Sequence, residues 1–319
     1  MPAPVVVAEV VRSGFVEGHH HGSVVALAAD GSVDWSLGDV ESPILPRSCN
    51  KPLQVVGMLR AGLRLDGELL ALAAASHSGE AFHLEGVRRI LASVGLDEEA
   101  LQTPPDHPLD DQARDEHIRA GGRPSSLAMN CSGKHAAMLA TCVANGWDTS
   151  TYLQVDHPLQ VAIAASFAKL TGEPVEMVAV DGCGAPLLSA SLVALARAYR
   201  TLATAERGPE RAVAQAIRAH PEHVSGSRRD EAVLLRAVPG AVLKAGAESC
   251  YAVGLRDGRA VALKTDDGSA RVRPVLMAAA LERCGVTGEA GVDADSVRRT
   301  GVVRLLGGGR PVGELRATF

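Results

Sequence analysis

The sequence of 319 residues contains very few lysines. Of its 32 basic residues, 27 are arginines and only five are lysines: Lys51, Lys134, Lys169, Lys244 and Lys264. Because arginine supplies most of the positive charge, a lysine indicates a position where a permanently charged, planar group will not serve. A desolvated lysine can lose its proton and act as a general base, whereas arginine cannot. The lysines other than Lys169, which lies in an ordinary helical pattern, are therefore candidates for a functional role.

The sequence also lacks paired cysteines, long apolar runs and an excess of basic charge. Its six cysteines form no Cys-x-x-Cys pair, so we expect no disulfide framework and a cytoplasmic location. No apolar run is long enough to span a bilayer, and the segment Met1-Pro-Ala-Pro4 does not resemble a secretory signal. A net charge of −5 argues against nucleic acid or an anionic membrane as a partner.

Strand patterns lie at both ends of the chain, and helical patterns lie between them. Runs rich in β-branched residues predict strands over residues 5–11, 23–29, 32–37, 241–244, 250–255, 259–265, 302–306 and 312–316. The apolar 3.6-residue period predicts helices over residues 69–75, 84–94, 109–120, 135–144, 158–170, 186–205, 210–220, 230–238 and 271–284. Residues 18–22, which contain the triple histidine His19-His20-His21, are predicted to form a loop without a metal role.

This order of patterns predicts an α/β (α+β) fold with one mostly antiparallel sheet, to which both ends of the chain contribute. Residues 1–45 and 239–319 would form the sheet region, and residues 46–238 would form a mainly helical region. No internal repeat or linker divides the sequence, so we expect a single domain over residues 1–319.

A serine and a lysine three residues apart begin the helical region, in the segment 47–52. One helical turn brings Ser48 and Lys51 to the same face, and a 3₁₀ turn brings them closer still. Pro52 is tolerated in the first turn of a helix, where free backbone N–H groups favour developing negative charge. The pair could act as a nucleophile with its own base. On its own, however, Ser-x-x-Lys fits a helix cap followed by a solvated lysine equally well.

Four further polar segments punctuated by glycine interrupt the apolar elements, at residues 76–80, 130–135, 181–184 and 264–268. Each of them alone is explained by a helix end or a turn. Loops at the ends of regular elements are, however, where catalytic and binding residues concentrate. Together with the segment 47–52, these segments indicate an active site.

The five segments resemble, in order and spacing, the signature motifs of the asparaginase II family, the serine–lysine (thermolabile-type) asparaginases. The motifs are Arg47-Ser48-x-x-Lys51-Pro52, Ala75-Ser76-His77-Ser78, Asn130-Cys-Ser-Gly-Lys-His135, Asp181-Gly-Cys183 and Lys264-x-x-Asp267-Gly268. The resemblance runs from about residue 8 to the C-terminus. It implies a fold similar to that of serine β-lactamases and penicillin-binding proteins. It also implies a homodimer that hydrolyses L-asparagine to L-aspartate and ammonia.

The resemblance further implies roles for individual residues. Ser48 would be the nucleophile and Lys51 its base, and Ser76 with Lys264 would form a second serine–lysine pair. The residues implied to line the substrate pocket are Arg47, Asn130, His135 and Asp181. Those implied to bind a modulatory, non-essential zinc ion are Cys131, Lys134 and Cys183. The alternative for this last set is two pocket thiols beside a substrate-binding lysine, because it is not a standard four-ligand zinc site. No organic cofactor is implied.

Two features depart from the family pattern, and two other functions compete with it. Cys49-Asn50 stands where small or apolar residues are expected, and the triple histidine replaces a segment that is usually less rich in histidine. A β-lactamase or D,D-peptidase would share Ser-x-x-Lys, but the chain has neither Ser-Asp-Asn nor Lys-Thr-Gly. A non-catalytic amino-acid-binding or metal-binding protein would be expected to lose some of the four implied catalytic residues. All four are present, and this favours the asparaginase.

Overall fold

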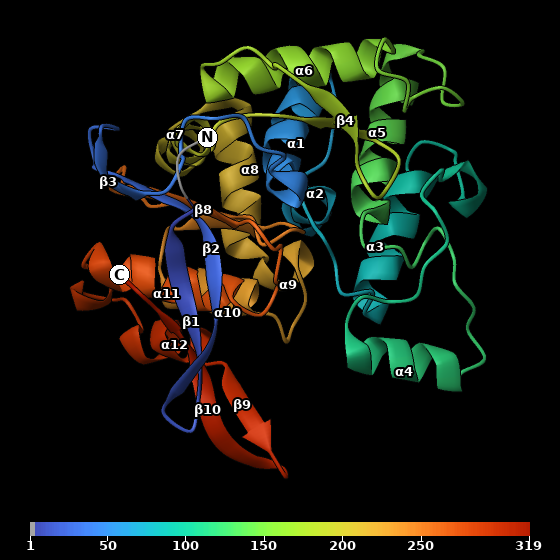
Figure 1. Ribbon diagram of the computed structural model, residues 1–319. Coiled ribbons are helices and arrows are strands. Elements are labelled where there is room, and N and C mark those ends of the chain that lie inside the picture. The colour runs from blue at the N-terminus through green and yellow to red at the C-terminus, as the bar shows by residue number, and fades with distance from the viewer. Residues whose placement is uncertain (1–3) are drawn as a thin grey trace. The chain divides into compact units, whose positions relative to one another are not determined.

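The computed structural model describes residues 4–319 as two compact units (Figure 1). Unit 1 contains the described residues up to Cys49, together with Ala190–Thr204 and Val233–Phe319. Unit 2 contains Asn50–Ser189 and Ala205–Ala232. Residues 1–3, with which the predicted sheet region begins, lie outside the described part of the chain.

Unit 1 is built on an eight-stranded antiparallel sheet in the order β6-β7-β8-β2-β1-β10-β9, with β3 paired to β2. Its strands are β1 (Val6–Arg12), β2 (Phe15–Leu27), β3 (Val33–Leu37), β6 (Val242–Ala245), β7 (Tyr251–Gly254), β8 (Ala260–Thr265), β9 (Arg304–Gly307) and β10 (Arg310–Ala317). β1 and β10 lie side by side, with Ala8 opposite Ala317 (Figure 1). The prediction of an antiparallel sheet built from both chain ends is therefore confirmed.

Strand β2 corrects the predicted loop at residues 18–22, because these residues continue the strand. Its first half pairs with β1, and its second half pairs with β8 and β3. The alternation of a strand places His20 in the interior, 5% exposed, and leaves His19 and His21 together on the other face. Pairing with neighbours on both sides thus outweighs the two glycines, Gly18 and Gly22, that suggested a loop.

The helices of unit 1 pack on this sheet. They are α7 (Leu192–Thr204), α11 (Arg273–Arg283), η3 (Val286–Gly288) and α12 (Ala294–Thr300). Helix α7 packs on β7 and β8, and α11 packs on β8 and β10. The sequence predicted a helix from residue 186, but α7 begins only at Leu192. Residues Pro186–Leu188 instead form strand β5 of unit 2, paired with β4 (Val178–Val180). Pro186, at which the predicted helix began, instead begins a short edge strand.

Unit 2 is helical, as predicted. Its helices are α1 (Lys51–Arg60), α2 (Gly67–Ala73), α3 (Ala81–Ala92), η2 (Glu98–Ala100), α4 (Asp111–Arg119), α5 (Ser132–Asn145), α6 (Pro158–Thr171), α8 (Gly208–Ala219) and α9 (Pro221–Val224). Helix α1 packs against α5, α6 and α8. Gly146 and Gly172 end α5 and α6 in the left-handed conformation that glycine adopts without strain. The short η1 (Arg47–Asn50) and α10 (Asp230–Ala237) cross from one unit into the other.

Among residues 4–319, none of the helices combines the length and the apolar character needed to cross a bilayer.

Candidate active site

The segment with Ser48 forms a single 3₁₀ turn, η1, that runs directly into α1. Helix α1 begins at Lys51 and carries Pro52 in its first turn, as the sequence predicts. Ser48 is half-buried. Arg47 has a φ of 53°, a left-handed conformation that is unfavourable for a residue with a Cβ atom. The boundary between the two units falls between Cys49 and Asn50, so Ser48 belongs to unit 1 and Lys51 belongs to unit 2.

Within unit 1, the backbone around Ser48 is held by α7 and by the end of β6. The Tyr199 hydroxyl donates a hydrogen bond to the Cys49 carbonyl at 2.8 Å, and the Cys49 thiol donates to the Lys244 carbonyl at 3.0 Å. A Cβ atom added to Gly246 would lie 2.8 Å from the Pro46 carbonyl oxygen, so only glycine permits this close approach. These contacts fix the turn on which Ser48 lies.

Unit 1 also gathers Arg47 and Lys264 around Glu248. Lys264 Nζ donates to the backbone carbonyls of Glu248 at 3.1 Å and Thr265 at 3.2 Å. Arg47 NH1 lies 3.5 Å from Glu248 Oε1. Glu248 and Ser249 have φ values of 54° and 53°, so three of the four left-handed non-glycine residues in the described chain meet here. Such strained backbone concentrates at functional sites.

The segment that follows Lys264 is held by one of the three adjacent histidines. His20 Nδ1 lies 2.5 Å from Asp267 Oδ2. The triple histidine therefore contributes one buried side chain, His20, that positions the segment 264–268. The sequence analysis assigned no role to these histidines.

Within unit 2, the structure brings Lys51 and Ser76 together. Lys51 is 1% exposed, and its Nζ donates to the Ala75 carbonyl at 2.6 Å and to Ser76 Oγ at 2.9 Å. Ser76 lies just beyond α2, and its backbone N–H donates to the Val224 carbonyl at 3.2 Å. A lysine amine within hydrogen-bond reach of a serine hydroxyl can exchange a proton with it. Two of the four predicted catalytic residues are thus in direct contact.

His77 connects the Ser76 segment to the beginning of α5. Its Nε2 lies 2.8 Å from Ser132 Oγ, which itself donates to the Leu127 carbonyl at 2.7 Å. Nε2 therefore carries the proton and donates it. Burial lowers the pKa of His77 well below 6.5, and the positive charge of Lys51 lowers it further. His77 is accordingly neutral and acts as a structural link, reinforced by its backbone bond to Asn130 at 3.0 Å.

Helix α5 carries the most specific of the motifs, residues 130–135, on its first turn. Gly133 allows this turn to pack against the end of α2, because a Cβ atom there would lie 2.5 Å from the Leu72 carbonyl oxygen. His135 Nδ1 lies 2.7 Å from the Tyr152 hydroxyl, and burial lowers the pKa of His135. The start of α5 therefore carries buried polar groups, and it is held by the end of α2 and by Tyr152.

Two side chains at the start of α5, Cys131 and Lys134, form a thiol–amine cluster with Cys183. Lys134 is 1% exposed, and its Nζ donates to Cys183 Sγ at 3.1 Å. A hydrogen bond with Cys131 lowers the pKa of Cys183, and Lys134 and His135 lower it further against the effect of burial. The same hydrogen bond raises the pKa of Cys131. Burial disfavours the charge of Lys134, but the two cysteines and Asp181 more than compensate, and its pKa is raised. These directions favour an anionic Cys183 beside a cationic Lys134.

Asp181 lies at the turn between β4 and β5. Its backbone N–H donates to the Ala185 carbonyl at 2.9 Å, and its Oδ1 accepts the Gly182 N–H at 2.9 Å. Unit 2 therefore gathers Asn130, His135 and Asp181 of the predicted substrate pocket around the thiol–amine cluster, while Arg47 belongs to unit 1.

The cluster suits a zinc ion only in part. Thiolates are good zinc ligands, but Lys134 is a proton donor here and could ligate a metal only after losing its proton. Within the described range 4–319, no three side chains of His, Cys, Asp or Glu come together as a possible metal site. Zinc binding at this cluster would therefore have to release protons from Cys131 and Lys134.

Sequence reasoning missed two residues of the site, Tyr152 and Glu248. Tyr152 could have been found from its rarity, because the chain has only three tyrosines. All three are fully buried, and two of them, Tyr152 and Tyr199, donate or share hydrogen bonds with residues of the predicted motifs. Glu248 gave no comparable signal, since its role depends on a left-handed backbone that the sequence does not reveal.

Comparison with known proteins defines the class of this protein, which is an amidohydrolase. The chain belongs to the L-asparaginase II family, whose model matches residues 8–317. A search of curated proteins found no match.

Solved structures similar to this chain include a β-lactamase, a probable glutaminase and the protein Mglu. The β-lactamase from Mycobacterium bovis is 14% identical, with a TM-score of 0.47, over 82% of this chain and 94% of that one. A probable glutaminase from Bacillus subtilis, solved with 6-diazo-5-oxo-L-norleucine, is 13% identical, with a TM-score of 0.39, over 88% and 90%. Mglu is 12% identical, with a TM-score of 0.44, over 83% of this chain and 67% of that one. At these TM-scores neither substrate nor mechanism follows from the likeness.

Proposed function

We propose that this protein is an L-asparaginase, which hydrolyses L-asparagine to L-aspartate and ammonia through an acyl-serine intermediate. The observation that carries the proposal is the contact of 2.9 Å between Lys51 Nζ and Ser76 Oγ, in surroundings from which water is excluded. Ser48 precedes Lys51 by three residues, in the 3₁₀ turn that runs into α1, and the family match covers residues 8–317.

In the proposed reaction, Ser48 Oγ attacks the side-chain amide carbon of asparagine and Lys51 takes the hydroxyl proton. The tetrahedral intermediate then breaks its C–N bond, and the leaving nitrogen takes a proton relayed from Lys51 through Ser76, so that ammonia departs. A water molecule attacks the resulting ester, gives its proton to the same relay and releases aspartate, which restores Ser48. Lys264 would complete the relay as the partner of Ser76 that the family resemblance implies.

The substrate is an amino acid that carries both charges, and its recognition needs groups of both signs. The Arg47 guanidinium suits the α-carboxylate, because it can donate two parallel hydrogen bonds. The Asp181 carboxylate suits the α-ammonium group. Asn130 and His135 would line the pocket beside them, and Tyr152 holds the His135 ring through the contact at 2.7 Å.

We also propose that Cys131, Lys134 and Cys183 bind Zn²⁺, which would tie the segment of Asn130 and His135 to Cys183 without taking part in bond breaking. Metal analysis of the purified protein tests this, with Cys131→Ser as the variant that should lose zinc. Chelation should raise KM more than it lowers kcat, because Ser48 already supplies the nucleophile. Complete, zinc-reversible loss of kcat would contradict a modulatory role.

Two further parts of the proposal concern assembly and location. The protein would be a cytoplasmic homodimer, and its six free thiols are consistent with a reducing compartment. Light scattering of the purified protein and fractionation of its source cells test the two statements.

One assay tests the main proposal. Ammonia release is measured from L-asparagine, L-glutamine and D-asparagine, beside acylation by a penicillin. We expect rapid release from L-asparagine, slower release from L-glutamine, and no stable penicillin adduct. A β-lactam adduct without asparagine turnover would indicate a β-lactamase or D,D-peptidase. Binding of asparagine without release of ammonia would indicate a non-catalytic binding protein.

A further inference from the structure

The segment 76–80, which carries Ser76, has no regular secondary structure. Its position therefore depends on contacts with the segments around it. The backbone of Ser76 bonds to Val224 and that of His77 bonds to Asn130, while the Ser78 carbonyl accepts the Asp110 N–H at 3.1 Å. Three different parts of unit 2 thus hold the segment, and one of them, residues 224–228, contacts it from Ser76 to Glu80. An added Cβ on Gly226 would lie 2.0 Å from Ser78 Oγ.

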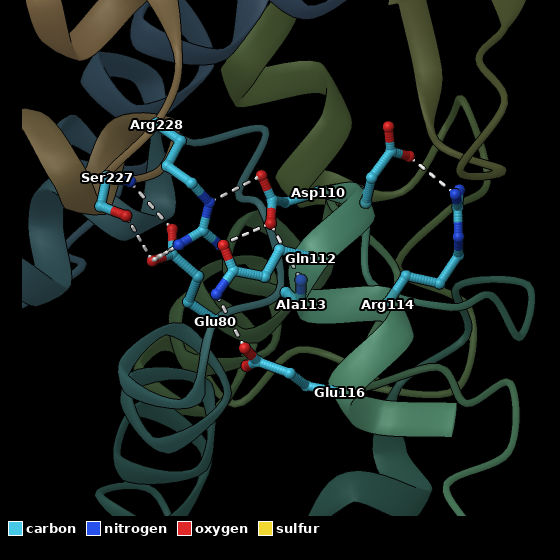
Figure 2. A network of polar contacts seen from close by, with 9 residues as sticks. Glu80, Asp110, Gln112, Ala113, Arg114, Glu116, Ser227 and Arg228 are labelled. Atoms are coloured by element: carbon cyan, nitrogen blue, oxygen red, sulfur yellow. Dashed lines mark hydrogen bonds and ion pairs between the residues drawn. The ribbon is translucent and has the colours of Figure 1, made fainter. Parts of the chain in front are cut away.

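The far end of the segment is held by a network of three charged residues and one serine, which we call the latch: Glu80, Asp110, Arg228 and Ser227 (Figure 2). Glu80 accepts the Ser227 backbone N–H at 2.9 Å and the Ser227 hydroxyl at 2.6 Å. Arg228 donates to both carboxylate oxygens of Asp110, at 3.2 and 2.5 Å, and its NH1 lies 3.8 Å from Glu80 Oε2. Figure 2 shows the guanidinium between the two carboxylates.

Arg228 therefore connects both sides of the segment 76–80. On one side it holds Glu80, the last residue of the segment. On the other it holds Asp110, whose backbone N–H bonds to Ser78 and whose Oδ1 also caps α4 through the Ala113 N–H at 2.9 Å. Without the guanidinium, two carboxylates would face each other with no cation between them.

The two carboxylates of the latch are less exposed than the guanidinium between them. The side chains of Glu80 and Asp110 are 14% and 15% exposed, while Arg228 is 41% exposed. Paired, fork-shaped hydrogen bonds between arginine and a carboxylate hold geometry as well as charge. A cavity of about 380 Å³ lies beside the latch and is lined in part by Gly79, Glu80 and Arg228, so water reaches the guanidinium and the far end of the segment.

We propose that Arg228 is a positioning residue of the active site, which fixes the segment 76–80 through Glu80 and Asp110 and so keeps the Ser76 hydroxyl on Lys51. The inference rests on the proposed function in one respect, since it takes Ser76 as a member of the proton relay. Arg228 itself touches neither Ser76 nor Lys51, so its effect on the reaction is indirect.

The test compares Arg228→Ala, Arg228→Lys and Asp110→Asn with a matched control, Arg114→Ala. Arg114 donates to Asp111 at 2.7 Å on the same helix α4, in an exposed pair that does not involve the segment 76–80 (Figure 2). Two quantities are measured: kcat and KM for L-asparagine, and the hydrogen-exchange rates of peptides that span residues 75–80.

For Arg228→Ala, we expect kcat to fall about 10- to 100-fold, since small misplacements of reacting groups have effects of this size. KM should change little, because the residues proposed to bind the substrate charges lie outside the segment. Exchange in residues 75–80 should become faster. Arg228→Lys should be intermediate in both measurements, because lysine keeps the charge but lacks the planar fork. Arg114→Ala should match the wild type in both.

The outcomes separate the latch from the proposed function. Wild-type kcat and wild-type exchange in Arg228→Ala would overturn the latch, and so would an equal loss of kcat in Arg114→Ala. If Arg228→Ala does not fold, Arg228→Lys and Asp110→Asn decide in its place. If the wild type does not hydrolyse asparagine, the proposed function fails. The exchange rates then decide alone: faster exchange in the latch variants, and not in the control, supports the latch, and unchanged exchange overturns it.

Discussion

Lys51 and Lys134 lie in the same unit and are buried to the same degree, each 1% exposed, yet their partners differ. Lys51 donates only to neutral oxygen atoms, the Ala75 carbonyl and the Ser76 hydroxyl. Lys134 donates to the sulfur of Cys183, whose pKa is lowered first by its hydrogen bond with Cys131. A buried ammonium without an anionic partner is costly to keep charged, whereas an ion pair holds its charge in place. The difference favours Lys51 for proton transfer and Lys134 as a fixed charge as long as no metal is bound.

The largest expected effect concerns the group that Lys51 would serve. Ser48→Ala should lower kcat for L-asparagine by several powers of ten, because the covalent nucleophile is removed. The melting temperature should stay close to that of the wild type, since the half-buried Ser48 side chain contributes little to the core. Ser191→Ala is the matched control, a serine at the beginning of α7 outside the motifs. Near-wild-type turnover by Ser48→Ala would eliminate the serine–lysine mechanism.

The comparison itself is tested by placing arginine at each lysine. Lys51→Arg should lower kcat by roughly 10²–10⁴, the usual cost of losing a positioned general base, because arginine stays protonated. Lys134→Arg keeps the positive charge beside Cys183 and should retain far more activity. Lys169→Arg, on the exposed face of α6, should behave as the wild type. The measurement is kcat in one buffer for all three variants, with the melting temperature of each.

Two results would break the comparison in different ways. High activity in both Lys51→Arg and Lys264→Arg would mean that these lysines supply only positive potential. A loss in Lys134→Arg as deep as that in Lys51→Arg would mean that Lys134 also needs to lose its proton. The second result would favour its role as a metal ligand.

A third test removes the anion that distinguishes the two lysines. Cys183→Ser removes the sulfur to which the buried Lys134 ammonium donates. Breaking one partner of a buried ion pair costs about 3–5 kcal/mol of folding free energy. Urea unfolding of the apoprotein measures the loss, with Cys284→Ser, at a half-buried thiol, as the control. A loss no larger than that of the control would show that Cys183 is not a thiolate in the folded protein.

The rarity of lysine pointed to positions at which the structure buries this residue type. Three of the five lysines are buried, Lys264 is half-buried, and Lys169, which the sequence set apart, is exposed. The same reasoning applied to tyrosine would have identified Tyr152 and Tyr199, both fully buried at the site. A rare residue type is informative because a more abundant one would otherwise serve at an ordinary position.

The features that the sequence could not predict depend on contacts between distant segments. The residues 18–22 look like a loop by composition, and only pairing with β1 and β8 makes them a strand. The left-handed backbone at Glu248, which bonds Lys264, has no local signature. The same is true of the latch, in which Arg228 holds Asp110 from 118 residues away in the sequence. Local patterns identify elements and motifs, and tertiary contacts decide where their side chains meet.

The smallest expected effect extends the comparison to buried histidines without an anionic partner. His83 is fully buried, its Nε2 lies 2.9 Å from the Glu222 carbonyl, and burial lowers its pKa to about 3. Below pH 6.5 the unfolded chain takes up a proton at His83 and the folded chain does not, so the folded state loses stability as the pH falls. The loss is at most about 1.4 kcal/mol per pH unit down to pH 3.

His83→Gln should remove this contribution, because the glutamine amide can still donate to the Glu222 carbonyl but does not titrate. The free energy of unfolding is measured between pH 7 and pH 4 for both proteins. We expect the variant to have the flatter profile, while His77 and His135 maintain part of the slope because burial also lowers the pKa of each. An equal slope in the wild type and in His83→Gln would mean that His83 is protonated inside the folded protein. In that case His83 would form an ion pair with Glu80, the carboxylate that raises its pKa, as Lys134 does with Cys183.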